Sequence, residues 1–197
     1  MPLQQEAFFR FSAVSPDGQK AHTAYEHLNG YYEACIMQYS RIYELWRVSS
    51  AIPVTPEDQG AFQTKRKAMQ QVVRDIHFLL ISLQVIWKTL QTMCNASLYP
   101  SFADLIPLQD KWASYFEQYR EPRNTFEHYD DQVLGSDTRN NNPGYGVSLS
   151  ADGGFNLGVH QKVDINEDFY QQLIEFKHEF EAAIDSILEK TTIDRAE

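Results

Sequence analysis

The segment FLLISLQVIW, residues 78–87, is the longest apolar run in the sequence. It is shorter than the roughly 20 apolar residues that a bilayer-crossing helix needs, and Ser82 and Gln84 interrupt it. On both sides of this run, apolar residues recur at three- and four-residue steps between Phe62 and Leu90. This spacing predicts a helix that runs to about residue 95, with its second half buried in the core.

The residues before this helix predict where it begins. Thr55 suits the N-cap position, where a side-chain oxygen accepts a bond from the first turn. Pro56 suits the first helical position, and Glu57 and Asp58 place negative charge near the positive end of the helix dipole.

The same periodicity predicts the other helices. One spans residues 20–49, with an apolar face of Leu28, Tyr32, Cys35, Tyr39, Ile42 and Trp46. A third begins with a capping box of Ser101 and Asp104 and restarts at Pro107 and again at Pro122. A fourth spans residues 166–190, capped by Asn166, with an apolar face of Phe169, Leu173, Phe176, Phe180, Ile184 and Ile187.

Between the last two helices, the sequence changes character. Residues 135–144 are rich in Asn, Gly and Ser, which is typical of a loop, and residues 145–163 alternate partly around a DGG turn. The predicted fold is therefore all-α: a four-helix, up-down bundle with a β-hairpin inserted before the last helix. We expect a single domain over residues 1–197, with residues 1–20 as an irregular lead-in and residues 135–164 as the loop and hairpin insertion.

Composition restricts the function classes. The net charge of −10 disfavours coating of nucleic acid or anionic membranes through the overall field. Cys35 and Cys94 lie in apolar helical contexts, so we expect buried free thiols. The N-terminus lacks a basic region followed by an apolar run, so no secretory signal is expected. We expect a cytoplasmic protein without a membrane-spanning helix.

The segment EPRNTFEHYDD, residues 121–131, carries the candidate chemistry. On a helix, Asn124 and His128 share one face, and Arg123 and Glu127 share the neighbouring one. Arg123 and His128 are about 140° apart around the axis, but a long guanidinium arm can turn its charge towards the imidazole. After Pro122, Arg123 is expected in a first turn whose backbone N–H groups lack partners and attract anions.

These groups suit RNA cleavage by the RNA's own 2′-hydroxyl. A histidine, with a reference pKa near 6.5, can take or give the proton at cellular pH. An arginine can bridge two phosphate oxygens while it keeps its charge. The reaction needs no metal ion or other cofactor, and we expect none.

The motif Arg123-Asn124-Thr125-Phe126-Glu127-His128 resembles the arginine–polar–three residues–histidine motif of HEPN domains. These are helical bundles found in RNA-cleaving toxins and antiviral defence proteins. The resemblance implies a metal-independent endoribonuclease in which Arg123 and His128 are catalytic and Asn124 orients them or the substrate. It also implies a homodimer with a composite site, an RNA substrate, and an antitoxin or regulatory partner.

Further residues are assigned to the same site. Glu127 would modulate Arg123. The basic run at residues 64–67 supplies Lys65, Arg66 and Lys67 as candidate contacts to the RNA backbone, together with Arg120.

Other interpretations remain open. The motif can be a solvated helix start in which Arg123 pairs with Glu127. The protein can also be a non-catalytic HEPN-like dimerisation or ligand-sensing module, which the acidic charge favours, or a small-ligand or nucleotide binder with a pocket between bundle and hairpin. Glu175 and His178 have the spacing of a di-iron ligand pair, but a second Glu-x-x-His is absent, so we expect the pair on the wet side of the last helix. His77 is expected to be a partly buried core histidine.

Overall fold

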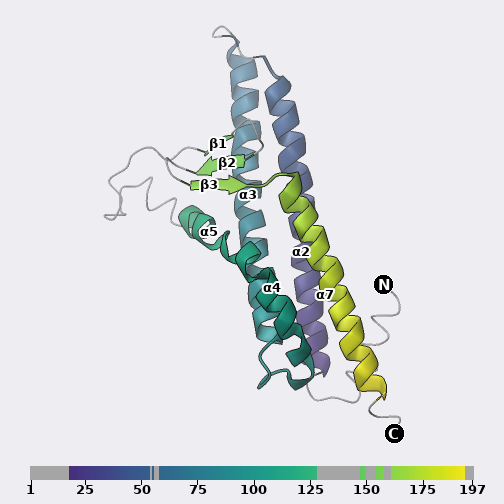
Figure 1. Ribbon diagram of the computed structural model, residues 1–197. Helices are drawn as coiled ribbons and strands as arrows, with labels where there is room; N and C mark the ends of the chain where they lie inside the picture. The colour runs from purple at the N-terminus through teal and green to yellow at the C-terminus, as the bar shows by residue number, and fades with distance from the viewer. Residues whose placement is uncertain are drawn as a thin grey trace. The chain divides into compact units, whose positions relative to one another are not determined.

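The computed structural model describes residues 18–53, 55, 58–127, 147–149, 154–157 and 161–193. This part of the chain is predominantly helical, which confirms the all-α prediction at that level (Figure 1). The three long helices are α2 (Gly18–Ala51), α3 (Gln59–Met93) and α7 (Glu167–Ile193). The shorter ones are the 3-10 helix η1 (Pro100–Leu105), α4 (Ile106–Glu117) and α5 (Arg120–Glu127). Within these described residues, no helix combines the length and apolarity needed to cross a bilayer.

The chain divides into two compact units. Unit 1 comprises residues 1–32, 84–117 and 171–197, and unit 2 comprises residues 33–83 and 118–170. The described part of unit 1 therefore contains the start of α2, the end of α3, η1, α4 and most of α7. The described part of unit 2 contains the rest of α2 and α3, α5, the strands and the first turn of α7.

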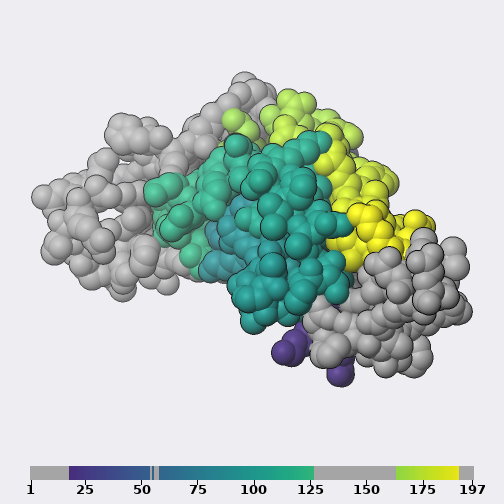
Figure 2. Space-filling view, turned by 60° about the horizontal axis from the view of Figure 1, so that its bottom comes forward, coloured from purple at the N-terminus to yellow at the C-terminus, as the bar shows by residue number. Residues whose placement is uncertain are grey.

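Aromatic side chains form the core of unit 1. Phe176 of α7 is fully buried and meets Phe116 of α4 edge to face, with ring centroids 4.9 Å apart. Trp87 of α3 stacks on the ring of Phe116, with ring centroids 5.4 Å apart. Because these rings come from three helices, their burial ties α3, α4 and α7 together within this unit. Figure 2 shows the teal atoms of η1 and α4 packed against the yellow atoms of α7.

Polar contacts supplement this aromatic core. The indole N–H of Trp112 donates to Glu179 at 3.0 Å, and Lys111 pairs with the same carboxylate. The hydrogen bonds from Lys111 and Trp112 lower the pKa of Glu179, with that of Lys111 as the largest cause. Lys177 is buried, and its ammonium group donates to Asn29 and Glu181, each at 2.6 Å. The buried ammonium group of Lys177 and the indole N–H of buried Trp112 are thus matched with acceptors, as a stable interior requires.

In unit 2, residues 33–51 of α2 pack against residues 59–83 of α3 (Figure 1). Asp75 of α3 is buried, and its Oδ1 lies 3.4 Å from Arg41 of α2 and 3.2 Å from the amide of Gln71. Tyr39 of α2 stacks on Tyr170 with centroids 4.8 Å apart, which joins the first turn of α7 to this pair of helices.

Three short strands also belong to unit 2. They are β1 (Val147–Leu149), β2 (Gly154–Leu157) and β3 (Gln161–Asp164), and they form an antiparallel sheet in the order β1-β2-β3. Leu149 faces Phe155 in the first pair, and Phe155 faces Val163 in the second. Val163 is buried, so β3 contributes to the core of this unit. Residues 150–153, which contain most of the predicted turn, lie outside the described residues.

The helix caps differ from the predictions in two places. α3 begins after Asp58, whose carboxylate accepts a bond from the N–H of Ala61 at 2.8 Å, so the prediction of Thr55 as N-cap was wrong. The capping box of Ser101 and Asp104 was also wrong, because both residues lie inside η1 and Asp104 pairs instead with Lys190. The cap at Asn166 is confirmed, since its Oδ1 accepts a bond from the N–H of Phe169 at 3.0 Å.

The cap of α3 gives a stability prediction. We expect Asp58→Ala to lower the free energy of unfolding by about 1 kcal/mol, because it leaves a first-turn N–H without its side-chain acceptor. Thr55→Ala is the matched control and should change stability by less than about 0.5 kcal/mol. Urea unfolding followed by circular dichroism measures both. A larger loss for Thr55→Ala than for Asp58→Ala would contradict this assignment of the cap.

Candidate active site on helix α5

Helix α5 carries the start of the predicted motif. Tyr119, the residue just before the helix, anchors its first turn. This tyrosine is buried, and its hydroxyl donates to the backbone oxygen of Asp164 at the end of β3, at 3.4 Å. Burial raises the pKa of Tyr119 well above its ordinary value, so the hydroxyl stays protonated and remains a donor. Pro122, in the first turn, is also buried. The start of α5 is therefore held against the sheet of its own unit.

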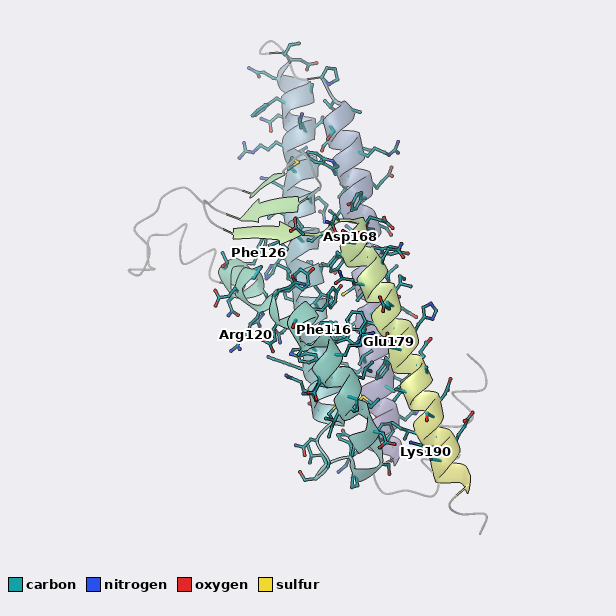
Figure 3. All side chains as sticks on the ribbon, in the orientation of Figure 1. Phe116, Arg120, Phe126, Asp168, Glu179 and Lys190 are labelled. Atoms are coloured by element: carbon teal, nitrogen blue, oxygen red, sulfur yellow. The ribbon has the colours of Figure 1, made fainter. Side chains whose placement is uncertain are left out.

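The other end of α5 is anchored by Phe126. Its ring lies parallel to the imidazole of His77 on α3, with centroids 5.4 Å apart and an interplanar angle of 11°. Phe126 is buried and His77 is half-buried, as expected for a core histidine. Figure 3 labels Arg120 and Phe126 at opposite ends of this short helix. The stack therefore holds the end of α5 against α3.

Arg123 and Asn124 lie between these two anchors, and both are partly exposed. The Nη1 of Arg123 donates to the Oδ1 of Asn124 at 3.1 Å. Neighbouring residues on a helix project in different directions, so this bond draws the guanidinium towards the Asn124 side of the helix. Arg123 thus has a polar neighbour that restrains its orientation while part of the side chain stays accessible to solvent.

One expectation about this site was wrong. The backbone N–H of Arg123 is not a free first-turn donor, because it bonds to the carbonyl oxygen of Tyr119 at 3.1 Å. α5 begins at Arg120, so Arg123 already belongs to the hydrogen-bonded part of the helix, and Pro122 has no N–H to offer. An anion at Arg123 would therefore meet the guanidinium and not a cluster of backbone amides.

The structure describes some of the other predicted site residues and leaves others outside the described ranges. His128 lies outside the described residues, and Glu127 is the last residue of α5, with a side chain that is also outside them. Arg120 is exposed at the first position of α5. Lys65, Arg66 and Lys67 lie in the early turns of α3, where Arg66 and Lys67 are exposed and Lys65 is half-buried. All of these described residues belong to unit 2.

The structure also describes the residues of the alternative sites. Glu175 and His178 are exposed on α7, as expected, and Glu175 lies 3.5 Å from Lys111. In the described ranges, no three His, Cys, Asp or Glu side chains are grouped so as to hold a metal ion. Cys35 and Cys94 are buried free thiols, as predicted, and burial raises the pKa of Cys94 to about 11. Such a thiol is protonated at neutral pH and is a poor nucleophile.

Two contacts that shape the site were not predicted from the sequence. They are the stack of His77 on Phe126 and the bond from Tyr119 to the end of β3. No pattern in the local sequence marks a stack between residues on two different helices.

Comparisons with known protein families, with curated proteins and with solved structures gave no match.

Proposed function

We propose that this protein is a metal-independent endoribonuclease of the HEPN type, which acts as a homodimer with a composite site. Arg123 stabilises the charge on the phosphorane, His128 transfers the proton, and Asn124 positions the guanidinium. The four-helix, up-down arrangement of that family is part of the same proposal. A role in a toxin–antitoxin or defence system, with an antitoxin or regulatory partner, follows from the resemblance.

The observation that carries the proposal is the bond between Arg123 and Asn124. A guanidinium that is restrained before the substrate arrives loses less conformational entropy when it binds phosphate, and it can present two parallel N–H donors. The polar residue of the motif thus has a physical role here, because its carbonyl oxygen lies 3.1 Å from the arginine that it would orient. This supports a catalytic role for Arg123.

The surrounding charges fit a secondary role in binding. Arg120 is exposed on the same helix as Arg123, and Lys65, Arg66 and Lys67 form the only concentrated basic run in an acidic chain. Contacts of these groups to phosphate would strengthen RNA binding in a salt-dependent way without reading the bases.

The test is cleavage of a single-stranded RNA by the purified protein in EDTA. We expect Arg123→Ala to lower the rate by about 10²–10³-fold, because an oriented donor to the developing charge is removed. Arg123→Lys should recover only a small part of this loss, since an ammonium cannot form the bidentate contact. Asn124→Ala should act in the same direction but more mildly.

Arg47→Ala is the matched control, because Arg47 is exposed on α2 and pairs with Glu44 of the same helix at 3.0 Å. It should leave cleavage unchanged. Light scattering on each variant measures the oligomeric state. If Arg123→Ala cleaves as fast as the wild type, the catalytic role is excluded. If the wild type does not cleave RNA and Arg123→Ala loses the dimer, the protein is instead a non-catalytic dimerisation module.

A further inference from the structure

A groove in unit 1 lies between the first turns of α2 and the last turns of α3. Its volume is about 650 Å³, which lies within the range of sites for small organic ligands. Ala24 and Val85 form part of its apolar wall, and Tyr99 closes it from the segment that follows α3. The described residues that line it are Lys20, Thr23, Ala24, His27, Val85, Lys88, Thr89, Thr92 and Tyr99.

The charge of this lining is opposite to that of the chain. The protein carries a net charge of −10, yet the described residues that line the groove include two lysines and a histidine and no carboxylate. Neither Lys20 nor Lys88 forms an ion pair with any residue that the structure describes. By contrast, Lys111, Lys177 and Lys190 in the same unit all pair with carboxylates. Among the residues that the structure describes, these two exposed lysines therefore have no carboxylate partner.

Two threonines of the groove donate within their own helices. The hydroxyls of Thr23 and Thr92 donate to carbonyl oxygens at 3.0 and 2.8 Å, so they have no proton left for a ligand. The Nδ1 of His27 lies 3.3 Å from the hydroxyl of Thr89. When Thr89 donates to Nδ1, the proton of the imidazole sits on Nε2, which then acts as a donor.

The length of the groove indicates more than a bare inorganic ion. Lys20 and His27 are seven positions apart on α2, which corresponds to about 10 Å along the helix axis. Lys88 lies next to Thr89, the partner of His27, so one lysine belongs to each end of the groove. Between them the wall is apolar, and the ring of Tyr99 offers a face for a planar group.

We propose that this groove binds a nucleoside monophosphate. The phosphate is held by Lys88 and His27, and the base lies along Ala24 and Val85 towards Tyr99. The phosphate pairs with the ammonium group of Lys88, and the base and sugar cover apolar wall that a free phosphate would leave exposed to water. The site lies entirely in unit 1, and its occupancy does not depend on the nuclease proposal, because it is measured as binding and not as cleavage.

Isothermal titration calorimetry of the full chain with AMP tests the proposal. We expect AMP to bind at least tenfold more tightly than adenosine or inorganic phosphate alone. Lys88→Gln should weaken AMP binding by about tenfold or more, and Ala24→Glu, which adds a carboxylate to the wall, should abolish it. Lys190→Gln is the matched control, because Lys190 is an exposed lysine of unit 1 outside this groove, and it should bind AMP like the wild type.

Several results would overturn the proposal. Absence of AMP binding at millimolar concentration rejects the site, and equal binding by wild type and both groove variants places the nucleotide elsewhere. If inorganic phosphate binds as tightly as AMP, the base has no role. If decanoate binds more tightly than AMP and is lost in Ala24→Glu, the groove takes fatty acids instead. Circular dichroism verifies that each variant is folded.

Discussion

Replacement of His128 by alanine is expected to lower the rate of RNA cleavage by about 10²–10⁴-fold, the usual contribution of a positioned general acid or base. This expectation rests on the proposed nuclease activity. Without the imidazole, the motif has no group whose ordinary pKa lies near neutral pH, because Arg123 keeps its charge. The measurement is the single-turnover cleavage rate of a labelled RNA in EDTA, with the mutant in excess.

The matched control is His178→Ala. His178 is an exposed histidine on α7, so its loss should change neither cleavage nor folding. The helical circular dichroism of His128→Ala should equal that of the wild type, which separates a chemical effect from unfolding. Persistent cleavage by purified His128→Ala would show that this histidine is not the proton carrier.

Replacement of Phe176 by alanine is expected to lower the free energy of unfolding by about 3–5 kcal/mol, the range found when a large aromatic side chain is removed from a core. Phe176 is fully buried in unit 1. Its ring meets Trp112 at 5.6 Å and Phe116 at 4.9 Å edge to face, and it stacks on Phe180 at 6.0 Å. These rigid rings cannot collapse into the space left by alanine, so the cavity cost adds to the lost burial.

Urea unfolding followed by tryptophan fluorescence measures this loss. The matched control is Phe78→Ala, because the Phe78 side chain on α3 is 54% exposed and its removal should cost less than about 0.5 kcal/mol. Similar losses for the two variants would mean that the ring cluster around Phe176 is not a principal source of stability.

Much of the helical structure follows from local patterns. Apolar residues at three- and four-residue steps place Leu28, Leu80 and Phe176 on buried faces, and all three are buried in the structure. Asn166 caps α7 as predicted, because a cap depends on a bond within a few residues of the chain. The competition between Thr55 and Asp58 was not predictable in this way, since both residue types suit the cap and the backbone path decides between them.

In the candidate site, too, some features follow from local sequence and others do not. The order Arg123-Asn124-x3-His128 is readable in the sequence, and its chemistry follows from the side chains themselves. The restraint of Arg123 by Asn124 and the stack of Phe126 on His77 are not readable there. The backbone N–H of Arg123 is bonded to Tyr119 and not free, because the helix begins at Arg120, two residues before its proline.

The order of the amino acids alone indicates that the chain is helical and that its net charge is acidic, and it offers Arg123 and His128 as candidates for phosphate binding and proton transfer. Side-chain identity and periodicity act over a few residues, so they are present in the order of the amino acids. Only the tertiary structure decided which aromatic rings meet, where Tyr119 and Phe126 anchor α5, and that Lys20 and Lys88 share one groove. Those contacts join residues far apart in the chain, and they depend on how whole helices pack, a choice that no local pattern contains.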